Sequence, residues 1–368
     1  MNKGAGIHVP VSGQVSGIEE SEMLEDVGNS VQFAAGKFYE KFEHDYAAFM
    51  GYKHALFVNS GSSANLLMIT AQRWAGPVRV SGCSFPTTIN PIIQTNNTPY
   101  FVDIELGTYL TKTKVDIGCH FLGNWCESGK IIDSCDGMFP GEDSRTMTSS
   151  FFPAHFMTTG EGGMVLTNDT KEFMHMRSLR DWGRDCWCAP GNDNTCGKRF
   201  EHVIDGVEYD HKYIYSNIGY NLKSTEMAAA IGLAQLKKLP GFLEARVRNF
   251  NHLYYGGSFW MDKYFIMPES VKPDTAWFGF PLTIREDAPF TRKEITQYLD
   301  SVGVGNRVMF GGNITRQPAY KDVDYDADPL PNCDIVMQRG FWIGCWHGLE
   351  LTQLDYTLDK IKEFTERY

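Results

Sequence analysis

The sequence predicts an α/β protein in two parts: a large domain built on a mostly parallel sheet and a smaller α+β C-terminal domain. Between about residues 50 and 240, short apolar runs alternate with helical patterns, which is typical of parallel strands joined by crossover helices. After about residue 245, a strand-like run, WFGFPLTI, precedes a helix with a strong start signal. We therefore expect a large domain over residues 1–245 and a small domain over residues 246–368.

The individual elements follow from local patterns. The predicted strands of the large domain lie in HALFVNS, VRVSG, PYFVDIE, KIIDSCD and GGMVLTND, and LLMITAQRW follows the first of them as a helix. Apolar residues at i, i+3, i+4 and i+7 over 227–234 predict another helix, with Ser224 or Thr225 as its N-cap. In the small domain, Thr291 and Glu294 have the spacing of a capping box.

Composition narrows the class of protein. The chain has 368 residues, 42% of them hydrophobic and 21% charged, which fits an ordinary globular protein. Its formal net charge of -11 argues against sequence-independent nucleic-acid binding. The N-terminus lacks the apolar core of a signal peptide and no run approaches a membrane span, so we expect a cytoplasmic protein without membrane segments. In that reducing compartment the nine cysteines are not expected to form disulfides.

A glycine- and serine-rich hexamer, SGSSAN, lies at residues 60–65 between a predicted strand and a predicted helix. Small residues let backbone amides approach an anion, and a helix N-terminus adds partial positive charge. The hexamer is therefore a candidate phosphate site, with an ordinary tight turn as the alternative. It matches neither a nucleotide-hydrolase loop nor a dinucleotide fingerprint.

An aspartate ends one of the predicted buried strands. Asp133 in KIIDSCD lies at the C-terminal end of its strand, the edge at which open α/β sheets bind ligands. A carboxylate there can keep a pyridinium nitrogen protonated, so that a pyridoxal-type ring accepts electrons. The alternative is a helix-capping aspartate. Asp136, three residues further on, is placed to face the same site.

Five segments together carry a family resemblance: SGSSAN, IIDSCD, SFFPAH, GEGG and GYNLKSTEMAAAIGLAQL. They resemble the DegT/DnrJ/EryC1/StrS sugar aminotransferases, which are fold-type I enzymes that use pyridoxal phosphate. In most members, the segment that matches SFFPAH ends in the lysine that binds the cofactor covalently. Here that position is His155, and no lysine lies between Lys130 and Lys171.

The missing lysine changes the expected chemistry. Without a lysine amine the cofactor is expected to bind non-covalently as pyridoxamine 5'-phosphate, whose own amine can condense with a ketone. His155 is then the candidate general base that removes a proton from the cofactor, and the released electrons expel a hydroxyl group. That reaction is a dehydration, not a transamination. The alternative is a purely structural histidine between aromatic residues.

Longer motifs narrow the resemblance further: PAHxxTxGEGG, RDWGRDCxCAPGxDNTC, YDHKYxYSxxGYNLK, NxTRQP and FWIG. They are similar to the CDP-4-keto-6-deoxyglucose 3-dehydrase branch of the family. This resemblance implies dehydration at C3 of a nucleotide-linked 4-keto-6-deoxyhexose through a pyridoxamine phosphate adduct, followed by reduction through a 2Fe–2S cluster, in 3,6-dideoxyhexose biosynthesis. It also implies a separate NADH-dependent flavin and iron–sulfur reductase as electron donor, and a homodimer.

Three clustered cysteines, Cys186, Cys188 and Cys196, form a C-x-C-x7-C pattern that by itself is a weak metal signal. The resemblance implies that they hold the 2Fe–2S cluster with one upstream cysteine, Cys135, two residues after Asp133. Cys126 is the rival fourth ligand. Four thiolates suit such a cluster. The remaining cysteines are expected to be small buried residues, namely Cys83, Cys119, Cys333 and Cys345.

The resemblance assigns the rest of the site. Phe85 is expected to stack on the cofactor ring, unless it is a core residue. Asn221 is expected to reach the cofactor phosphate of the neighbouring subunit. The phosphate of the subunit's own cofactor is assigned to Gly61, Ser62 and Ser150. The candidate ligands of the nucleotide-sugar phosphates, with surface salt bridges as an equal alternative, are Arg307, Asn313 and Arg316.

The chain departs from the dehydrase pattern in three places. Phe152 replaces a tyrosine, Phe156 replaces a histidine, and the region over residues 111–133 is shorter than in the family, as if one helix were missing. Two other functions therefore remain open. One is a cluster-free dehydratase of the GDP-4-keto-6-deoxymannose type, against which the cysteine trio argues. The other is a non-catalytic sensor that kept the fold.

Overall fold

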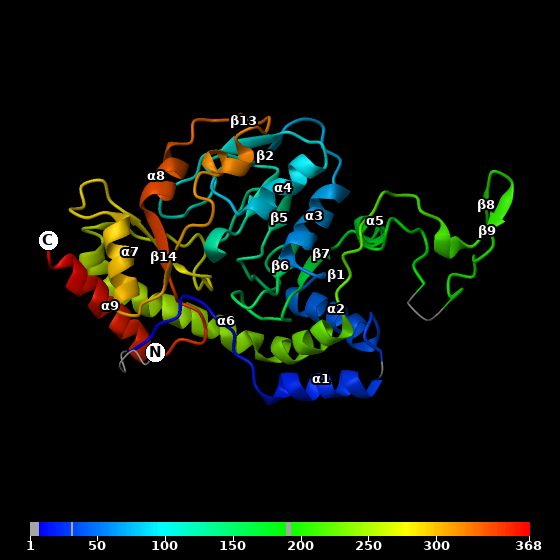
Figure 1. Ribbon diagram of the computed structural model, residues 1–368, viewed down its shortest axis with the longest axis horizontal. Coiled ribbons are helices and arrows are strands. Elements are labelled where there is room, and N and C mark those ends of the chain that lie inside the picture. The colour runs from blue at the N-terminus through cyan, green and yellow to red at the C-terminus, as the bar shows by residue number, and fades with distance from the viewer. Residues whose placement is uncertain (1–6, 31, 189–192) are drawn as a thin grey trace.

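An eight-stranded sheet forms the centre of the large part of the molecule (Figure 1). The computed structural model describes residues 7–30, 32–188 and 193–368. All neighbouring strands are parallel except at β7, which is antiparallel to both of its neighbours, so the predicted mostly parallel sheet is confirmed. The spatial order is β1 (His54–Val58), β7 (Gly163–Thr167), β6 (Thr146–Ser150), β5 (Ile131–Asp133), β4 (Ile117–Cys119), β2 (Val78–Ser81), β3 (Pro99–Val102) and β13 (Asp326–Ala327).

Helices cover both faces of this sheet. Successive residues of β1 point to opposite faces: Leu56 and Val58 belong to one buried cluster, whereas Phe57 belongs to another. The Leu56 side carries α3 (Gly61–Ala71), α4 (Pro86–Gln94) and α5 (Thr170–Arg180). The Phe57 side carries α2 (Lys37–Met50) and the first half of α6 (Glu226–Met261), and α1 (Ile18–Ser30) packs on α6. None of the described helices is both long and apolar enough to span a lipid bilayer.

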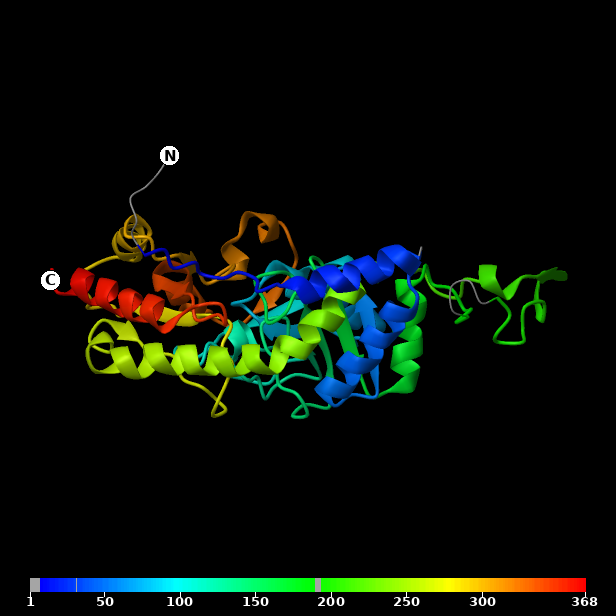
Figure 2. The same ribbon diagram turned by 90° about the horizontal axis from the view of Figure 1, so that it is seen from below.

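The C-terminal part is built on a second sheet of four antiparallel strands. Thr291 and Glu294 form the predicted capping box at the start of α7. The expected boundary at residue 245 falls within α6, a continuous helix capped by Thr225 that runs from the large part into the small one (Figure 2). The elements of this part are β10 (Phe265–Ile266), β11 (Phe280–Ile284), β14 (Gly340–Ile343), β12 (Asn306–Val308), α7 (Arg292–Ser301), α8 (Pro331–Arg339) and α9 (Leu351–Thr365).

An arm projects from one end of the molecule, between α5 and α6 (Figures 1 and 2). We define the arm as residues 182–188 and 193–220; a backbone bridge between Asp181 and Asn221 closes its base. It contains a hairpin of β8 (His202–Ile204) and β9 (Val207–Tyr209) and a 3-10 turn, η2 (His211–Tyr213). The hairpin strands pair only with each other among the described strands.

The connection between β4 and β5 is unusually short. Residues 120–130, all of which are described, contain one 3-10 turn, η1 (Phe121–Gly123), and no α-helix, as the length of the segment predicted. This loop packs directly on β4, because a Cβ at Gly118 would lie 2.1 Å from the Ser128 carbonyl oxygen. The place of a crossover helix is therefore taken by backbone without regular hydrogen bonding.

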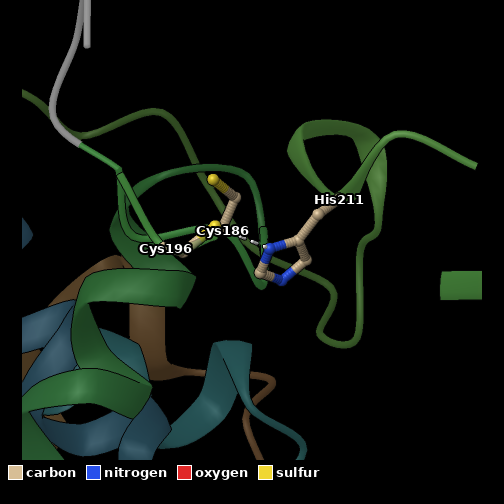
Figure 3. Close-up of side chains that lie close together, drawn as sticks. All are labelled: Cys186, Cys196 and His211. Carbon is tan, nitrogen blue, oxygen red and sulfur yellow. Dashed lines mark hydrogen bonds between the residues drawn. The ribbon is translucent and has the colours of Figure 1, made fainter. Parts of the chain in front are cut away.

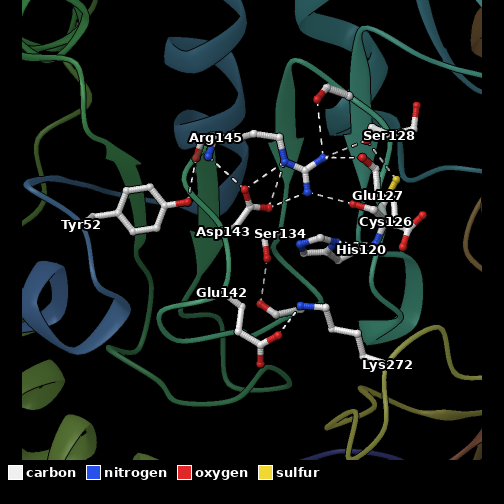
Figure 4. Close-up of polar contacts among 12 residues, drawn as sticks. Tyr52, His120, Cys126, Glu127, Ser128, Ser134, Glu142, Asp143, Arg145 and Lys272 are labelled. Carbon is white, nitrogen blue, oxygen red and sulfur yellow. Dashed lines mark hydrogen bonds and ion pairs between the residues drawn. The ribbon is translucent and has the colours of Figure 1, made fainter.

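One arginine donates hydrogen bonds to several backbone carbonyl oxygens of this loop (Figure 4). The Arg145 guanidinium donates to the carbonyl oxygens of Cys126 at 2.9 Å, Glu127 at 3.1 Å and Ser128 at 3.3 Å. Its Nε also donates to the Asp143 carboxylate at 2.9 Å. Arginine suits this position because its planar fork presents several donors in fixed directions.

We expect Arg145→Ala to lower the free energy of unfolding by about 3 kcal/mol, because it removes the guanidinium that donates to the loop carbonyls and pairs with the Asp143 carboxylate. Urea denaturation checks this. The matched control is Arg367→Ala, at a half-exposed side chain near the C-terminus, which should change stability by less than about 0.5 kcal/mol. Equal effects of the two substitutions would show that Arg145 does not hold the loop.

Candidate active site at the edge of the large sheet

A cavity of about 550 Å³ lies at the carboxyl ends of β5 and β6, between the large sheet and residues of the small part. Open α/β sheets bind ligands at this edge. The cavity contains most of the residues that the sequence assigned to the cofactor and to catalysis. Those lining it are Gly61, Ser62, Phe85, Asp133, Cys135, Asp136, Ser150, His155 and Arg307.

Asp133 is fixed in one orientation at the cavity wall. It is 5% exposed; its Oδ2 accepts hydrogen bonds from Asn65 Nδ2 at 2.8 Å and Thr88 Oγ1 at 2.7 Å, and its Oδ1 accepts one from the Cys135 amide at 3.1 Å. All three partners are donors, so the carboxylate is fixed in an orientation in which it can accept one more hydrogen bond from a donor in the cavity. The contacts of Asn65 and Thr88 with Asp133 were not predicted from the sequence: Asn65 ends the SGSSAN hexamer, but neither residue carried a separate assignment.

The SGSSAN hexamer forms the turn from β1 into α3, as predicted. Ser60 caps the helix by accepting a hydrogen bond from the Ser63 amide at 3.1 Å. Gly61 has no room for a side chain, since a Cβ there would lie 2.7 Å from Ser150 Cβ. Ser62 and Ser150 line the cavity beside it. A helix N-terminus, a bare backbone and two hydroxyl groups together fit a phosphate group.

His155 and Asp136 face each other in the same cavity. His155 Nδ1 lies 3.6 Å from Asp136 Oδ1, and it has no hydrogen-bond partner among the described residues. None of the described residues that line the cavity is a lysine. The position that the resemblance assigns to a lysine is therefore occupied by an imidazole whose Nδ1 makes no hydrogen bond with the described residues.

A buried arginine lies directly behind His155. Arg246 of α6 is 0% exposed, and its guanidinium donates to the carbonyl oxygens of His155 at 2.8 Å and Phe278 at 3.0 Å. It also lies over the Phe156 ring, 4.6 Å from its centroid. No sequence motif marks this residue, which lies in the middle of the long helix α6.

Burial and charge set the protonation of the pair. Burial and the neighbouring Arg246 guanidinium lower the pKa of His155 to about 3. Burial and the negative charge of Asp133 raise the pKa of Asp136 to about 8. At neutral pH the Asp136 carboxyl group is therefore protonated, and the His155 imidazole is neutral and able to accept a proton.

Other assigned residues lie further from the cavity. Asn313 is buried and donates to Asp334 at 2.7 Å, and Arg316 forms an ion pair with the same carboxylate at 3.0 Å. Neither lines the cavity, whereas Arg307 does. Asn221 lies at the base of the arm, outside the cavity.

The cysteines occupy separate places. Cys119 was expected to be fully buried, but it is partly exposed and lines the cavity, because it pairs with Asp133 across β4 and β5. Cys126 is buried and donates to the Ser128 carbonyl oxygen at 3.2 Å. The expectation of burial holds for Cys83, Cys333 and Cys345.

The cysteine trio lines a small hollow in the arm together with His211. Figure 3 shows Cys186, Cys196 and His211. Cys196 Sγ lies 3.5 Å from His211 Nδ1, and ligand atoms of Cys186, Cys196 and His211 all lie within 4.8 Å of one another. Hydrogen bonds from Thr195 and Cys196 lower the pKa of Cys188 to about 6. These groups suit a thiophilic metal centre. Cys135 does not line this hollow; it lies in the main cavity.

Comparison with known proteins identifies close relatives. The sequence profile of the DegT/DnrJ/EryC1/StrS aminotransferase family matches residues 15–115 and 134–362. A dTDP-4-dehydro-2,6-dideoxy-D-glucose 3-dehydratase of Saccharopolyspora spinosa is 39% identical over 399 residues, covering 97% of this chain and 86% of the relative. The lipopolysaccharide biosynthesis protein RfbH of Salmonella typhimurium is 39% identical over 400 residues, covering 97% and 91%.

A solved structure supports the same fold. The E. coli GDP-4-keto-6-deoxy-D-mannose-3-dehydratase with bound hydrated PLP superposes with a TM-score of 0.84 at 24% identity, covering 97% of this chain and 100% of the other. This confirms the expected fold-type I architecture. The family profile is interrupted over residues 116–133, which is the short β4–β5 connection.

We expect Asp136→Asn to stabilise the cofactor-free protein at alkaline pH. The folded-state pKa of Asp136, about 8, is raised above its unfolded value, so the folded state binds more protons between these values and loses stability as pH rises through this window. Asparagine does not ionise and should raise Tm by about 5 °C at pH 8.5, with a clearly smaller gain at pH 5. Differential scanning calorimetry measures both.

The control is Asp322→Asn, at an exposed carboxylate, which should not show this pH-dependent gain. A Tm gain for Asp136→Asn that is the same at both pH values would contradict the raised pKa.

Proposed function

This chain belongs to the DegT/DnrJ/EryC1/StrS aminotransferase family, and we propose that it is a nucleotide-sugar 3-dehydrase. In this proposal it uses pyridoxamine 5'-phosphate to remove the C3 hydroxyl of a nucleotide-linked 4-keto-6-deoxyhexose. The observation that carries the proposal is His155, a neutral imidazole at the position of the family's lysine, in a cavity with no lysine among its described lining residues. The 3-dehydratase names of relatives support the same reaction.

The cavity residues fit the cofactor as a whole. Asp133 would accept the pyridinium N–H, and the α3 N-terminus with Ser62 and Ser150 would bind the phosphate. Phe85, which is 50% exposed at the cavity, would cover the ring. When bound, the cofactor supplies an amine that condenses with the substrate ketone and a ring that accepts electrons.

His155 has the role of general base. Its neutral imidazole would accept the proton that is released beside the bound cofactor when the C3 hydroxyl of the substrate is removed as water. Asp136, protonated at neutral pH, lies 3.6 Å from the imidazole and is the nearest carboxyl group to exchange that proton. With no lysine among the described lining residues to bind the cofactor covalently, the proposed outcome is dehydration and not transfer of an amino group.

Reduction completes the reaction. The unsaturated sugar needs two electrons and two protons to become the 3-deoxy-4-ketosugar, so that one ketosugar, two electrons and two protons give one product and one water. We propose that a 2Fe–2S cluster on Cys186, Cys188 and Cys196 passes the electrons singly. An NADH-dependent flavin and iron–sulfur reductase would supply them.

The family resemblance also suggests a substrate and a biological setting. We propose CDP-4-keto-6-deoxyglucose as the substrate, in deoxysugar biosynthesis for lipopolysaccharide O-antigen, with the enzyme acting as a cytoplasmic homodimer. Arg307, which lines the cavity, is the proposed contact for the nucleotide phosphates. Asn313 and Arg316 remain candidates only if Asp334 releases them.

The direct test is turnover. Anaerobically purified protein is incubated with pyridoxamine phosphate, reductase and NADH, and CDP-, dTDP- or GDP-linked 4-keto-6-deoxyhexose, and products are analysed by mass spectrometry. We expect a CDP-sugar product lighter by one oxygen atom. Turnover only with glutamate and without reductase would favour the cluster-free dehydratase. No turnover of any nucleotide ketosugar would favour a non-catalytic sensor.

We predict that His155→Lys suppresses dehydration roughly 10²- to 10⁴-fold, because the general base is lost, and creates a lysine that binds pyridoxal phosphate covalently. Borohydride treatment followed by mass spectrometry should find the cofactor attached to the variant and not to the wild-type chain. His155→Asn is the control, since it removes the base without adding an amine. Covalent attachment in the wild type would sink the proposal.

A further inference from the structure

A strained aromatic residue lines the main cavity. Phe310, in the loop that follows β12, has a backbone φ of 46°. A positive φ is an outlier for a bulky side chain, because Cβ then crowds the backbone. Two glycines follow, and Gly312 has a φ of 58°, so a glycine at position 310 would adopt the same turn without strain. A strained backbone that the fold maintains points to a function for its side chain.

The loop of this residue is fixed against the segment that carries Phe85. The Ile314 amide donates to the Gly82 carbonyl oxygen at 2.9 Å. A Cβ at Gly311 would lie 2.9 Å from the Ser84 carbonyl oxygen, so the two backbones are in direct contact there. The loop of the small part is therefore held at a fixed place beside the residue expected to cover the cofactor.

Aromatic rings from both parts of the molecule surround Phe310. Its ring is nearly perpendicular to that of Phe85, at 87° with centroids 6.0 Å apart, and to that of Phe121, at 86° and 5.3 Å. Phe278 and Trp342 lie 6.3 and 6.5 Å away on the other side of the contact between the parts. Edge-to-face pairs of this kind are favourable. Among the described residues, Phe310 is the one aromatic ring paired with Phe85, which is half exposed at the cavity.

We propose that Phe310 is a positioning residue for the cofactor: its ring holds Phe85 in the orientation from which Phe85 covers the cofactor ring. This inference rests on the proposed function. No lysine among the described lining residues can tether the cofactor, so its retention depends on Asp133, the SGSSAN hexamer and the ring that covers it. An exposed side chain changes rotamer on a picosecond to nanosecond timescale, and the perpendicular ring of Phe310 restricts that motion.

The competing role for Phe310 is packing between the two parts of the molecule. Its contacts with Phe121 on one side and Phe278 on the other also contribute to stability. A packing role predicts lower stability with unchanged affinity for the cofactor. A positioning role predicts weaker cofactor binding, and it predicts that this loss depends on the presence of Phe85.

Cofactor binding separates the two roles, and it requires neither turnover nor iron. The dissociation constant of pyridoxamine 5'-phosphate is measured by isothermal titration calorimetry on protein freed of cofactor by dialysis, and thermal unfolding is measured on the same samples. Phe310→Leu keeps the apolar volume but loses the flat ring, and Phe310→Tyr keeps the ring. Phe310→Gly removes the ring and relieves the strained backbone, so it provides a folded variant if leucine is not tolerated.

We expect Phe310→Leu and Phe310→Gly to weaken cofactor binding roughly 3- to 10-fold, the size of one edge-to-face contact, and Phe310→Tyr to stay within about twofold of the wild type. Inorganic phosphate, used as a competitor, should bind all of them equally, because it does not contact the ring. The matched control is Tyr325→Leu, at a partly exposed ring that does not line the cavity. It should leave the dissociation constant unchanged.

A double-mutant cycle with Phe85→Ala identifies the route of the effect. We expect the double variant, Phe85→Ala with Phe310→Leu, to bind the cofactor no more weakly than Phe85→Ala alone. Additive losses would show that Phe310 does not act through Phe85, and this result would overturn the inference.

Two further outcomes also decide. A wild-type protein that binds pyridoxamine phosphate, with unchanged affinity and a lower Tm in Phe310→Leu and Phe310→Gly, would assign the residue to packing and overturn this inference alone. A wild-type protein that does not bind pyridoxamine phosphate would overturn the proposed cofactor, and this inference with it.

Discussion

The site depends on one buried cation. The Arg246 guanidinium is fully enclosed, it has no carboxylate within ion-pair distance among the described residues, and it donates to the carbonyl oxygens of His155 and Phe278. It thereby ties the His155 turn of the large part and the segment before β11 of the small part to the long helix α6. A buried charge held by carbonyl dipoles and aromatic rings, without a carboxylate partner, is costly to misplace, so Arg246 holds both walls of the cavity at a fixed spacing.

The same cation also contributes to the protonation state of His155. Burial, reinforced by the positive charge of Arg246, lowers the pKa of His155 and keeps the imidazole neutral, and burial together with the negative charge of Asp133 raises the pKa of Asp136. The order of the two pKa values is therefore the reverse of the usual one: the pKa of Asp136 is the higher and the pKa of His155 the lower, at a distance of 3.6 Å. A neutral imidazole beside a protonated carboxyl group supports the proposed dehydration, because it offers a proton acceptor and a proton donor at one place.

The short β4–β5 connection shows how the fold keeps this site without a crossover helix. Asp133 follows directly from that connection, so any disorder in the loop would reach the residue proposed to hold the cofactor. Arg145 instead supplies the donors that the loop carbonyls need, and Gly118 lets the loop lie on the strand. Side-chain hydrogen bonds replace those that a helix would have made within itself.

Local chemistry in the sequence determined the strands, the capping box at Thr291, the phosphate turn at residues 60–65 and the position of Asp133, because each depends on neighbours along the chain. The sequence also placed an imidazole where relatives carry a lysine. Only the tertiary structure brought Asn65 and Thr88 to Asp133, and Arg246 to His155, since these contacts join segments that lie far apart in the sequence. It also decided that Cys135 and the other three cysteines lie in different places, because the arm leaves the body between α5 and α6 and spacing along the chain does not encode that direction.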